Sequence, residues 1–395
     1  MPSKIKYEKW PSFSQEEIEI ANNILTSGKV NYWTGPYGKN FESEFAKYVS
    51  SKYAVSVANG TLALELALRA LGIKQGDEVI VTPRSFIASV SCIVSLGGKP
   101  VFSDIEINSG NLSAKSIKEK ITKKTKAILC VHLGGWPCEM KEIMKIANEH
   151  EIYVIEDCAQ AHGAKYNGDS VGSIGHIGAW SFCQDKIMST AGEGGMLTTN
   201  SRKLWEKIWS YKDHGKDYQL VNAEDKSLGF KWLHKSFGSN YRMTEIQSAI
   251  GSYQLTLLDS WKASRTSNAN SLIEAMKKFE SFINIPVCPD HMENAFYRLY
   301  AYIIDGHTKP GWDRDKIVYE LNNIGVPAFQ GSCPEIYLER AFDKTDFKPK
   351  ERLINAKKLG LTSIAFLVHP TLTNDDINDM KDKIQHIMTL ASKNH

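Results

Sequence analysis

Short apolar runs alternate with amphipathic stretches along the first half of the chain. The runs are rich in β-branched and aromatic residues, and they predict strands at residues 53–57, 78–82, 126–132, 152–156, 179–182 and 196–199. Between the strands, apolar residues recur at helical spacing in residues 62–71, 87–96, 113–121 and 140–150. This alternation predicts an α/β fold with a mainly parallel mixed sheet.

One of these helical stretches, residues 62–71, is apolar on nearly every side. Such a helix is typical of a buried position rather than of a surface, where one face would be polar. Its N-terminus would then be buried too. The unpaired N–H groups there would need partners.

After residue 199 the predicted helices become longer, at 202–211, 244–262 and 265–279. A β-like run at 297–304 follows, then a helix at 314–323 and helices near 350–359 and 375–390. We therefore predict a large domain at 1–261 and a smaller α+β C-terminal domain at 262–395. Residues 213–228 are polar and without periodicity, which predicts a loop over the surface or over a site.

Composition excludes several classes of function. The 395 residues are 42% hydrophobic, and 48 Lys and Arg against 45 Asp and Glu leave a net charge of +3, which gives no overall attraction to nucleic acid. The longest apolar stretches are far shorter than the roughly 18 to 20 residues that cross a bilayer, and the N-terminal residues lack the apolar segment of a signal peptide. We expect a cytoplasmic protein without membrane or nucleic-acid partners.

The seven cysteines are scattered and include no Cys-x-x-Cys pair. This spacing supports neither a disulfide framework nor a zinc ribbon. We predict reduced thiols, most of them buried.

Three segments at strand ends could carry chemistry, because ligand sites of open α/β sheets form there. The first is Asn59-Gly60-Thr61, where a strand turns into the buried helix. Gly60 would let an anion approach the backbone, and the helix start offers free N–H groups. An ordinary turn with an N-cap is the alternative.

The second segment is the apolar strand that ends in Glu156 and Asp157 and continues to Gly163. A carboxylate in that place could hold a protonated ring nitrogen through a charge-assisted hydrogen bond. Two alternatives are simple capping of the next helix and a metal site made of Asp157, Cys158 and His162. The metal site lacks a second ligand pair at the usual spacing.

The third segment places Lys186 just past a strand end, among Trp180, Phe182 and the glycines of residues 192–195. Desolvation there would lower the pKa of the ammonium and favour the nucleophilic amine that Schiff-base chemistry needs. A surface lysine is the alternative. The glycines neither follow a strand as Gly-x-Gly-x-x-Gly nor open a helix, which disfavours an NAD-dependent oxidoreductase.

Together the three segments suit one ligand with a phosphate, a basic ring nitrogen and a carbonyl, and pyridoxal 5'-phosphate (PLP) has all three. The chain also resembles the sugar aminotransferases of the DegT/DnrJ/EryC1/StrS family, which have the fold-type I aminotransferase architecture. The motifs that carry this resemblance are Thr34-Gly35-Pro36, Ala58-Asn59-Gly60-Thr61, Glu156-Asp157-Cys158-Ala159-Gln160-Ala161-His162-Gly163, Ser181-Phe182-Cys183-Gln184-Asp185-Lys186, Gly192-Glu193-Gly194-Gly195, Asn240-Tyr241-Arg242-Met243 and His369-Pro370.

The resemblance implies roles for individual residues. Lys186 matches the catalytic lysine that binds the cofactor covalently and moves the proton, and Asp157 matches the carboxylate at the pyridinium nitrogen. Gln160 matches a residue near the ring hydroxyl, and Phe86 lies where the family places a residue against the ring face. Phosphate contacts are implied for Gly60, Thr61 and Ser181.

The resemblance also implies a homodimer with shared active sites, because Asn240 matches an asparagine that reaches the phosphate of the neighbouring subunit. His162 and Arg242 are further candidates for contact with substrate. For His162 the alternative is packing in the core. For Arg242 it is a structural salt bridge.

The implied activity is PLP-dependent transfer of an amino group from L-glutamate to a nucleotide-linked keto-sugar for glycan biosynthesis. A UDP-linked 4-keto-6-deoxy-2-acetamido hexose is the first expectation; a 3-keto sugar or a GDP- or dTDP-linked sugar is the alternative. A related branch with histidine in place of the lysine catalyses dehydration, and Lys186 speaks against that branch. A non-catalytic PLP-binding regulator is a further alternative, disfavoured by the intact lysine, aspartate and glycine set.

Overall fold

The computed structural model describes residues 7–223 and 229–393 and contains a central seven-stranded sheet. Its order is β1-β9-β8-β5-β4-β2-β3. The five strands from β8 to β3 are parallel, and β9 runs antiparallel to both of its neighbours, β8 and β1. The predicted mixed, mainly parallel sheet is thus confirmed. The strands are β1 (Tyr53–Val57), β2 (Glu78–Val81), β3 (Lys99–Phe102), β4 (Thr125–Val131), β5 (Tyr153–Asp157), β8 (Ile177–Ser181) and β9 (Gly195–Thr199).

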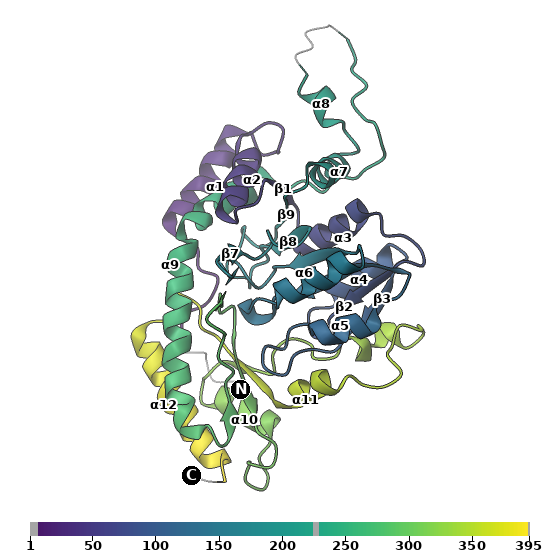
Figure 1. Ribbon diagram of the computed structural model, residues 1–395. Helices are drawn as coiled ribbons and strands as arrows, with labels where there is room; N and C mark the ends of the chain where they lie inside the picture. Colours follow the sequence, from purple (N-terminus) through teal and green to yellow (C-terminus); the bar gives the residue numbers. More distant parts are fainter. Residues whose placement is uncertain (1–6, 224–228, 394–395) are drawn as a thin grey trace.

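Helices cover both faces of this sheet (Figure 1). Alternate residues of β2 and β4 enter two different cores, as the period of two along a strand requires. Val79, Val81 and Leu129 pack with one set of helices, whereas Ile80 and Ile128 pack with the other. The first set is α3 (Gly60–Leu71), α4 (Ala88–Ser95) and α7 (Arg202–Lys212), and the second is α5 (Ala114–Lys120) and α6 (Met140–Glu149).

Helix α3 is the predicted buried helix. Its residues from Ala63 to Ala70 are buried apart from Glu65 and Arg69, which form an ion pair at 2.8 Å. The Asn59 side chain caps the N-terminus by accepting a hydrogen bond from the Leu62 N–H (2.9 Å).

Helix α9 (Glu245–Met276) is one continuous helix of 32 residues, where the sequence pattern predicts two. The expected break near Ala263 and Ser264 is wrong, because neither residue interrupts the backbone hydrogen bonds as proline would. The helix passes through Trp261, where we place the domain boundary. The division into 1–261 and 262–395 therefore stays a prediction.

Two N-terminal helices that the sequence analysis does not predict, α1 (Gln15–Ser27) and α2 (Tyr37–Tyr48), pack against α9. Glu245, at the first position of α9, accepts hydrogen bonds from the Tyr37 and Gly38 N–H groups (2.7 and 2.8 Å). Its carboxylate lies so close to Gly35 that a Cβ there would meet it at 2.1 Å. One acidic side chain thus joins the starts of two helices.

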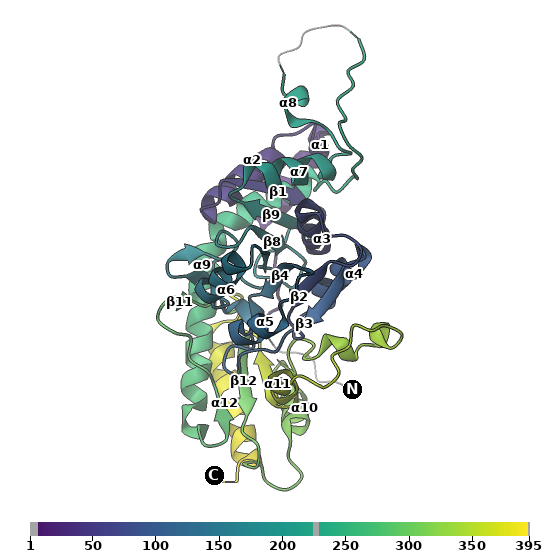
Figure 2. The same cartoon turned by 45° about the vertical axis from the view of Figure 1, so that its right-hand side comes forward.

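The C-terminal part contains a four-stranded antiparallel sheet, β10-β12-β14-β13, with helices α10 and α12 packed beside it (Figure 2). Tyr7 from the start of the chain joins this core and donates a hydrogen bond to Asp379 of α12 (2.9 Å). The elements are β10 (Ile283–Asn284), β12 (Leu299–Ile303), α10 (Arg314–Asn323), β13 (Ala328–Phe329), α11 (Ile354–Thr362), β14 (Ser363–Phe366) and α12 (Asn374–Ala391).

A third, small sheet joins β6 (Lys165–Tyr166) and β7 (Asp169–Ser170) to β11 (Met292–Glu293). All seven cysteines are free thiols, and four of them are buried, as the sequence predicts. Among the described helices, none combines the length and the apolar character that crossing a bilayer requires.

Between α7 and α9, residues 213–223 and 229–239 form an arm that projects away from the body of the molecule (Figures 1 and 2). It contains the short helix α8 (Tyr218–Val221), and its described part exposes three aromatic side chains, Phe230, Trp232 and Phe237. Residues 213–223 of the predicted loop lie in the arm and include α8, and its residues 224–228 lie outside the described residues.

Candidate active site

A cavity of about 560 Å³ opens at the carboxyl ends of β5 and β8, beside the N-terminus of α3. The three segments that the sequence analysis selects all meet there. The predicted residues that line the cavity are Gly60, Thr61, Phe86, Asp157, Gln160, Ser181 and Lys186.

One end of the cavity suits an anion. Helix α3 points its first N–H groups at this end, and Ser181 from the end of β8 lies directly beside Gly60. A Cβ on Gly60 would lie 2.5 Å from the Ser181 Cβ, which is far inside van der Waals contact. Glycine is therefore required for the turn and the serine to come together.

Asp157 lies deep in the cavity wall at the end of β5. Its carboxylate accepts hydrogen bonds from the Ser89 hydroxyl (2.9 Å) and from the Ala159 N–H (3.1 Å). Burial raises its pKa, although these two donors and the Lys186 ammonium act in the opposite direction. A cationic ring nitrogen placed against Asp157 would offset this burial.

Ser89 is not among the residues predicted from the sequence. It lies on α4, and its hydroxyl is 3.0 Å from that of Ser85, one turn earlier. Ser85 lies before α4 begins, and the helix also carries Ser91 and Ser95 at the same spacing, so the sequence contains no signal that singles out Ser89.

Gln160 has one half of its amide fixed. The Oε1 atom accepts a hydrogen bond from the Gly134 N–H (2.8 Å), and only 7% of the residue is exposed. The amide NH₂ group is thereby left to donate elsewhere. Phe86 lies at the cavity with 69% of its surface exposed, so its ring is free to cover a flat ligand.

Lys186 lies in the turn after β8, next to Asp185 and Tyr297. The Nζ atom is 3.4 Å from the Asp185 carboxylate and 5.3 Å from the centre of the Tyr297 ring, and Tyr297 donates a hydrogen bond to the same carboxylate. The lowered pKa predicted for the Lys186 ammonium from its place in the sequence is wrong for the structure. Burial lowers the pKa of the ammonium, but Tyr297 and Asp185 together more than offset burial and raise it.

These residues fit PLP. The α3 N-terminus and Ser181 suit a phosphate, the Asp157 carboxylate suits a pyridinium nitrogen, and the Gln160 amide suits a ring oxygen. Lys186 lines the same cavity, as a residue that captures a carbonyl must.

Three of the predicted site residues lie elsewhere. His162 is fully buried against Trp180 and Phe182, with ring centroids 5.4 and 5.5 Å apart. Burial lowers its pKa to about 3, and neither ring nitrogen has a partner among the described residues. The packing alternative accounts for His162, and contact with substrate does not.

Arg242 and Asn240 also stay outside the cavity of their own chain. Arg242 donates a hydrogen bond to buried Asp213 (2.8 Å), so it forms the salt bridge that we name as its alternative. Asn240 is exposed and pairs with Asp213 in an isolated β-bridge. That position leaves the predicted contact with a neighbouring subunit untested.

Among the described residues one group has the spacing of a metal site, made of His132, Glu156 and Cys158. The expected metal alternative with Asp157 and His162 does not form. The Glu156 carboxylate instead accepts three backbone hydrogen bonds, at 2.6 to 3.0 Å, and contacts the His132 ring at 3.1 Å. These donors occupy the lone pairs of the Glu156 carboxylate. The cluster therefore fixes the loop after β7 in place instead of offering ligands to a metal ion.

The sequence model of the DegT/DnrJ/EryC1/StrS aminotransferase family matches residues 11–385. The GDP-perosamine synthase of Escherichia coli O157:H7 is 40% identical over 275 residues, which are 68% of this chain and 72% of that protein.

Two solved structures show the likeness in three dimensions. An aminotransferase from Psychrobacter cryohalolentis is 52% identical with a TM-score of 0.96, over 97% of this chain and 99% of that one. The E. coli GDP-4-keto-6-deoxy-D-mannose-3-dehydratase with bound hydrated PLP is 26% identical with a TM-score of 0.85, over 96% of this chain and 99% of that one.

Proposed function

The chain belongs to the DegT/DnrJ/EryC1/StrS aminotransferase family, and on that premise we propose that it transfers an amino group from L-glutamate to a nucleotide-linked keto-sugar in glycan biosynthesis. It is a PLP-dependent sugar aminotransferase. The observation that carries the proposal is that Lys186 and Asp157, from two different segments, line one cavity with a phosphate-type helix N-terminus.

PLP supplies an electrophilic carbonyl and an electron sink when it is bound. The residues of the chain would hold and orient it: Asp157 keeps a proton on the ring nitrogen, and Gln160 donates to the ring oxygen. Gly60, Thr61 and Ser181 bind the phosphate. Phe86 covers the ring face and excludes water from it.

Lys186 would act as base and then as acid. Its Nζ atom takes the proton from the α-carbon of the donor, and later delivers a proton to the carbon that was the sugar ketone. Tyr297 and Asp185 hold the ammonium of Lys186, which keeps Nζ at the cavity. The proposal thus gives Lys186 both covalent and proton-transfer roles.

We propose a 4-keto-6-deoxy hexose as the acceptor, with a 3-keto sugar as the alternative. A UDP-linked 2-acetamido sugar is our prediction from family resemblance, whereas the E. coli relative is named for a GDP-linked product. The nucleotide is therefore the variable to be tested. The product would enter a bacterial surface glycan such as O-antigen lipopolysaccharide, or a glycosylated natural product.

We also propose a homodimer that shares its active sites. The support is that Asn240 lies outside its own cavity, at the base of an arm that exposes Phe230, Trp232 and Phe237. Large exposed aromatic side chains close together are typical of protein interfaces. Sedimentation tests the oligomeric state, and Asn240→Ala should weaken PLP binding only if the neighbouring subunit uses this residue.

The decisive experiment incubates the protein with PLP, glutamate and UDP-, GDP- and dTDP-linked 3-keto and 4-keto sugars. Aminated products would be identified by mass spectrometry and NMR. Amination of one sugar supports the proposal and names the substrate. A protein that holds PLP but never converts it with glutamate would contradict it and favour the regulator.

A further inference from the structure

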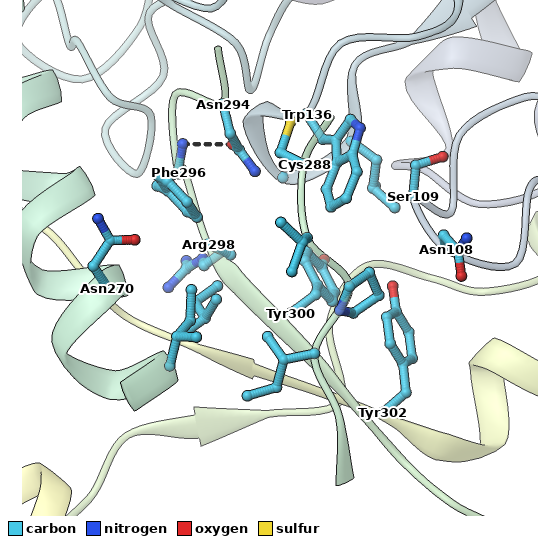
Figure 3. A pocket seen from close by; sticks show the side chains of 17 residues that line it. Asn108, Ser109, Trp136, Asn270, Cys288, Asn294, Phe296, Arg298, Tyr300 and Tyr302 are labelled. Carbon is cyan, nitrogen blue, oxygen red and sulfur yellow. Dashed lines mark hydrogen bonds between the residues drawn. The ribbon is translucent and has the colours of Figure 1, made fainter. Parts of the chain in front are cut away.

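Arg298, directly before β12, lies where three small cavities meet. The lysine-side cavity (about 260 Å³) is shared with Lys186 and Gln160, and the rear cavity (about 200 Å³) with Arg265 and His369. The aromatic cavity (about 270 Å³) is shared with Trp136, Tyr300 and Tyr302 (Figure 3). Among the residues that line these three cavities, only Arg298 lines all of them.

The guanidinium of Arg298 is held by aromatic rings alone. It lies 5.0 Å from the centre of the Tyr297 ring and 5.3 Å from that of Phe329. In the part of the chain that the structure describes, its side chain has neither an ion pair nor a hydrogen bond. Five N–H donors are therefore available to an anion.

A second arginine lies behind it. Arg265 on α9 is 2% exposed, and two of its guanidinium nitrogens have no partner among the described residues. Its pKa is lowered to about 9, first by burial and then by the charge of Arg298. Two guanidinium charges close together, in a site partly shielded from water, destabilise the protein unless an anion binds between them.

The acidic groups nearby do not supply that anion. Asp185, which lines the rear and lysine-side cavities, interacts with Arg298 through its charge, but its hydrogen bonds and its ion pair are with Tyr297 and Lys186. Glu8 lines the rear cavity but is exposed at its rim. The arginine pair is thus built for an anion that is not part of the described chain.

We infer that Arg298, with Arg265 behind it, binds a carboxylate of the dicarboxylate amino donor, glutamate, and of its 2-oxoacid product; this inference rests on the proposed function. Lys186 Nζ and the Arg298 guanidinium lie 5.3 and 5.0 Å from the centre of the same Tyr297 ring. The two cations are thus at most about 10 Å apart, which is the range that a dicarboxylate amino acid and its contacts to both groups can cover. A bidentate guanidinium–carboxylate pair would fix its orientation.

Arg298 would also allow one site to accept two chemically different substrates. The site must accept an anionic donor and then an uncharged keto-sugar ring in the same place beside Lys186. Since stacking alone holds Arg298, its side chain can turn from the lysine-side cavity toward the rear or aromatic cavity when the sugar enters. In Figure 3 it lies between Asn270 and Tyr300, at the edge of the aromatic cavity.

The test is Arg298→Gln in the PLP-loaded protein, with exposed Arg340→Gln as the matched control. Calorimetry with glutarate as the probe should show a dissociation constant raised about 10- to 100-fold in Arg298→Gln, the loss expected for a charge-assisted pair. The conversion of PLP by glutamate can be monitored through the visible absorbance of the cofactor. Its kcat/KM should fall by a similar factor in Arg298→Gln. Arg340→Gln should match wild type in both.

If Arg298→Gln does not fold, Arg298→Lys serves instead, because lysine keeps the charge but cannot form the bidentate pair and should bind glutarate more weakly. Unchanged glutarate affinity in the folded variant would overturn the inference. A loss of affinity for UDP, GDP or dTDP with glutarate unaffected would also overturn it and assign Arg298 to the sugar nucleotide. Wild type that reacts with glutamate but aminates no sugar would refute the proposed acceptor and leave the role of Arg298 standing.

Discussion

Two walls face each other across the site, and they differ in how their polar groups are satisfied. On the cofactor wall, from the large sheet, Asp157 accepts two hydrogen bonds and Gln160 is fixed by a backbone N–H. On the opposite wall, from α9 and the segment before β12, Arg265 and Arg298 have charged groups without acidic partners among the described residues. A cofactor that stays bound is suited to side chains whose orientation is already fixed by hydrogen bonds. Two substrates that bind in turn instead need side chains that are free to change partners.

Removal of the Lys186 amine, which lies between the walls, should have the largest effect. Lys186→Ala should abolish net transfer, with a loss of at least about 10⁴-fold in kcat, because both the covalent link and the proton carrier disappear. The visible absorbance of the lysine-bound cofactor should vanish as well. Turnover and absorbance measure the two losses, and exposed Lys118→Ala is the control. Full activity in Lys186→Ala would show that Lys186 is not the catalytic lysine.

The second largest effect is expected when the negative charge of Asp157, on the cofactor wall, is removed. Asp157→Asn keeps the shape but replaces an anion by an amide, which cannot stabilise a pyridinium charge, and the rate should fall by about 10²- to 10³-fold. Single-turnover conversion of the cofactor by glutamate measures this step. Exposed Asp169→Asn should have no effect. If Asp157→Asn behaves like wild type, Asp157 only caps the turn at Ala159.

A smaller loss is expected at the anion end of the cofactor wall. Gly60→Ala places a Cβ 2.5 Å from the Ser181 Cβ, so either the turn or the serine must move. The dissociation constant of PLP, measured by equilibrium dialysis, should rise about 10- to 100-fold, which corresponds to about 1.4 to 2.8 kcal/mol. Unchanged PLP affinity in Gly60→Ala would show that the phosphate does not bind at this turn.

The smallest effect concerns two neutral histidines, one behind each wall. The pKa values of buried His162 and His369 are lowered to about 3, chiefly by burial. Between about pH 3 and 6.5 the unfolded chain binds these protons and the folded chain does not, so the free energy of unfolding is highest above this window and falls as the pH falls. At about pH 5 each histidine should lower it by up to about 2 kcal/mol.

Urea denaturation at about pH 5 and pH 7 measures this slope in the apoprotein. His162→Leu should remove roughly half of it, and exposed His150→Gln should leave it unchanged. The pKa of His132 is raised instead, despite its burial, by Cys138 and Glu156. A raised pKa gives a slope of the opposite sign, and only above about pH 6.5, so it does not account for a loss of stability between pH 5 and 6.5. An unchanged slope in His162→Leu would show that His162 binds a proton in the folded state.

The cofactor wall could be predicted from the sequence and the opposite wall could not. Gly60, Asp157 and Lys186 each follow an apolar strand, so the order of strands alone brings them to one sheet edge. Arg265 lies within a long helix and Arg298 before a strand of another sheet. No local pattern links two residues whose proximity depends on tertiary packing.

Two other differences have local physical reasons. The pattern around residues 262–265 weakens without a helix-breaking residue, so a fading amphipathic signal is mistaken for a helix end. The pKa of Lys186 rises because Tyr297, 111 positions along the chain, and Asp185 offset burial. Sequence position shows that the lysine is buried but does not show which charges accompany it.

The continuity of α9 has a mechanical consequence. Its first turns pack on α1 and α2, and its later turns on α12, so one rod of about 48 Å is anchored at both ends of the molecule. A hinge between the two parts cannot lie in a flexible connection at this place. Any rotation that narrows the site must carry the rod as a unit or flex it elastically, and a proline in its middle would turn a stiff coupling into a loose joint.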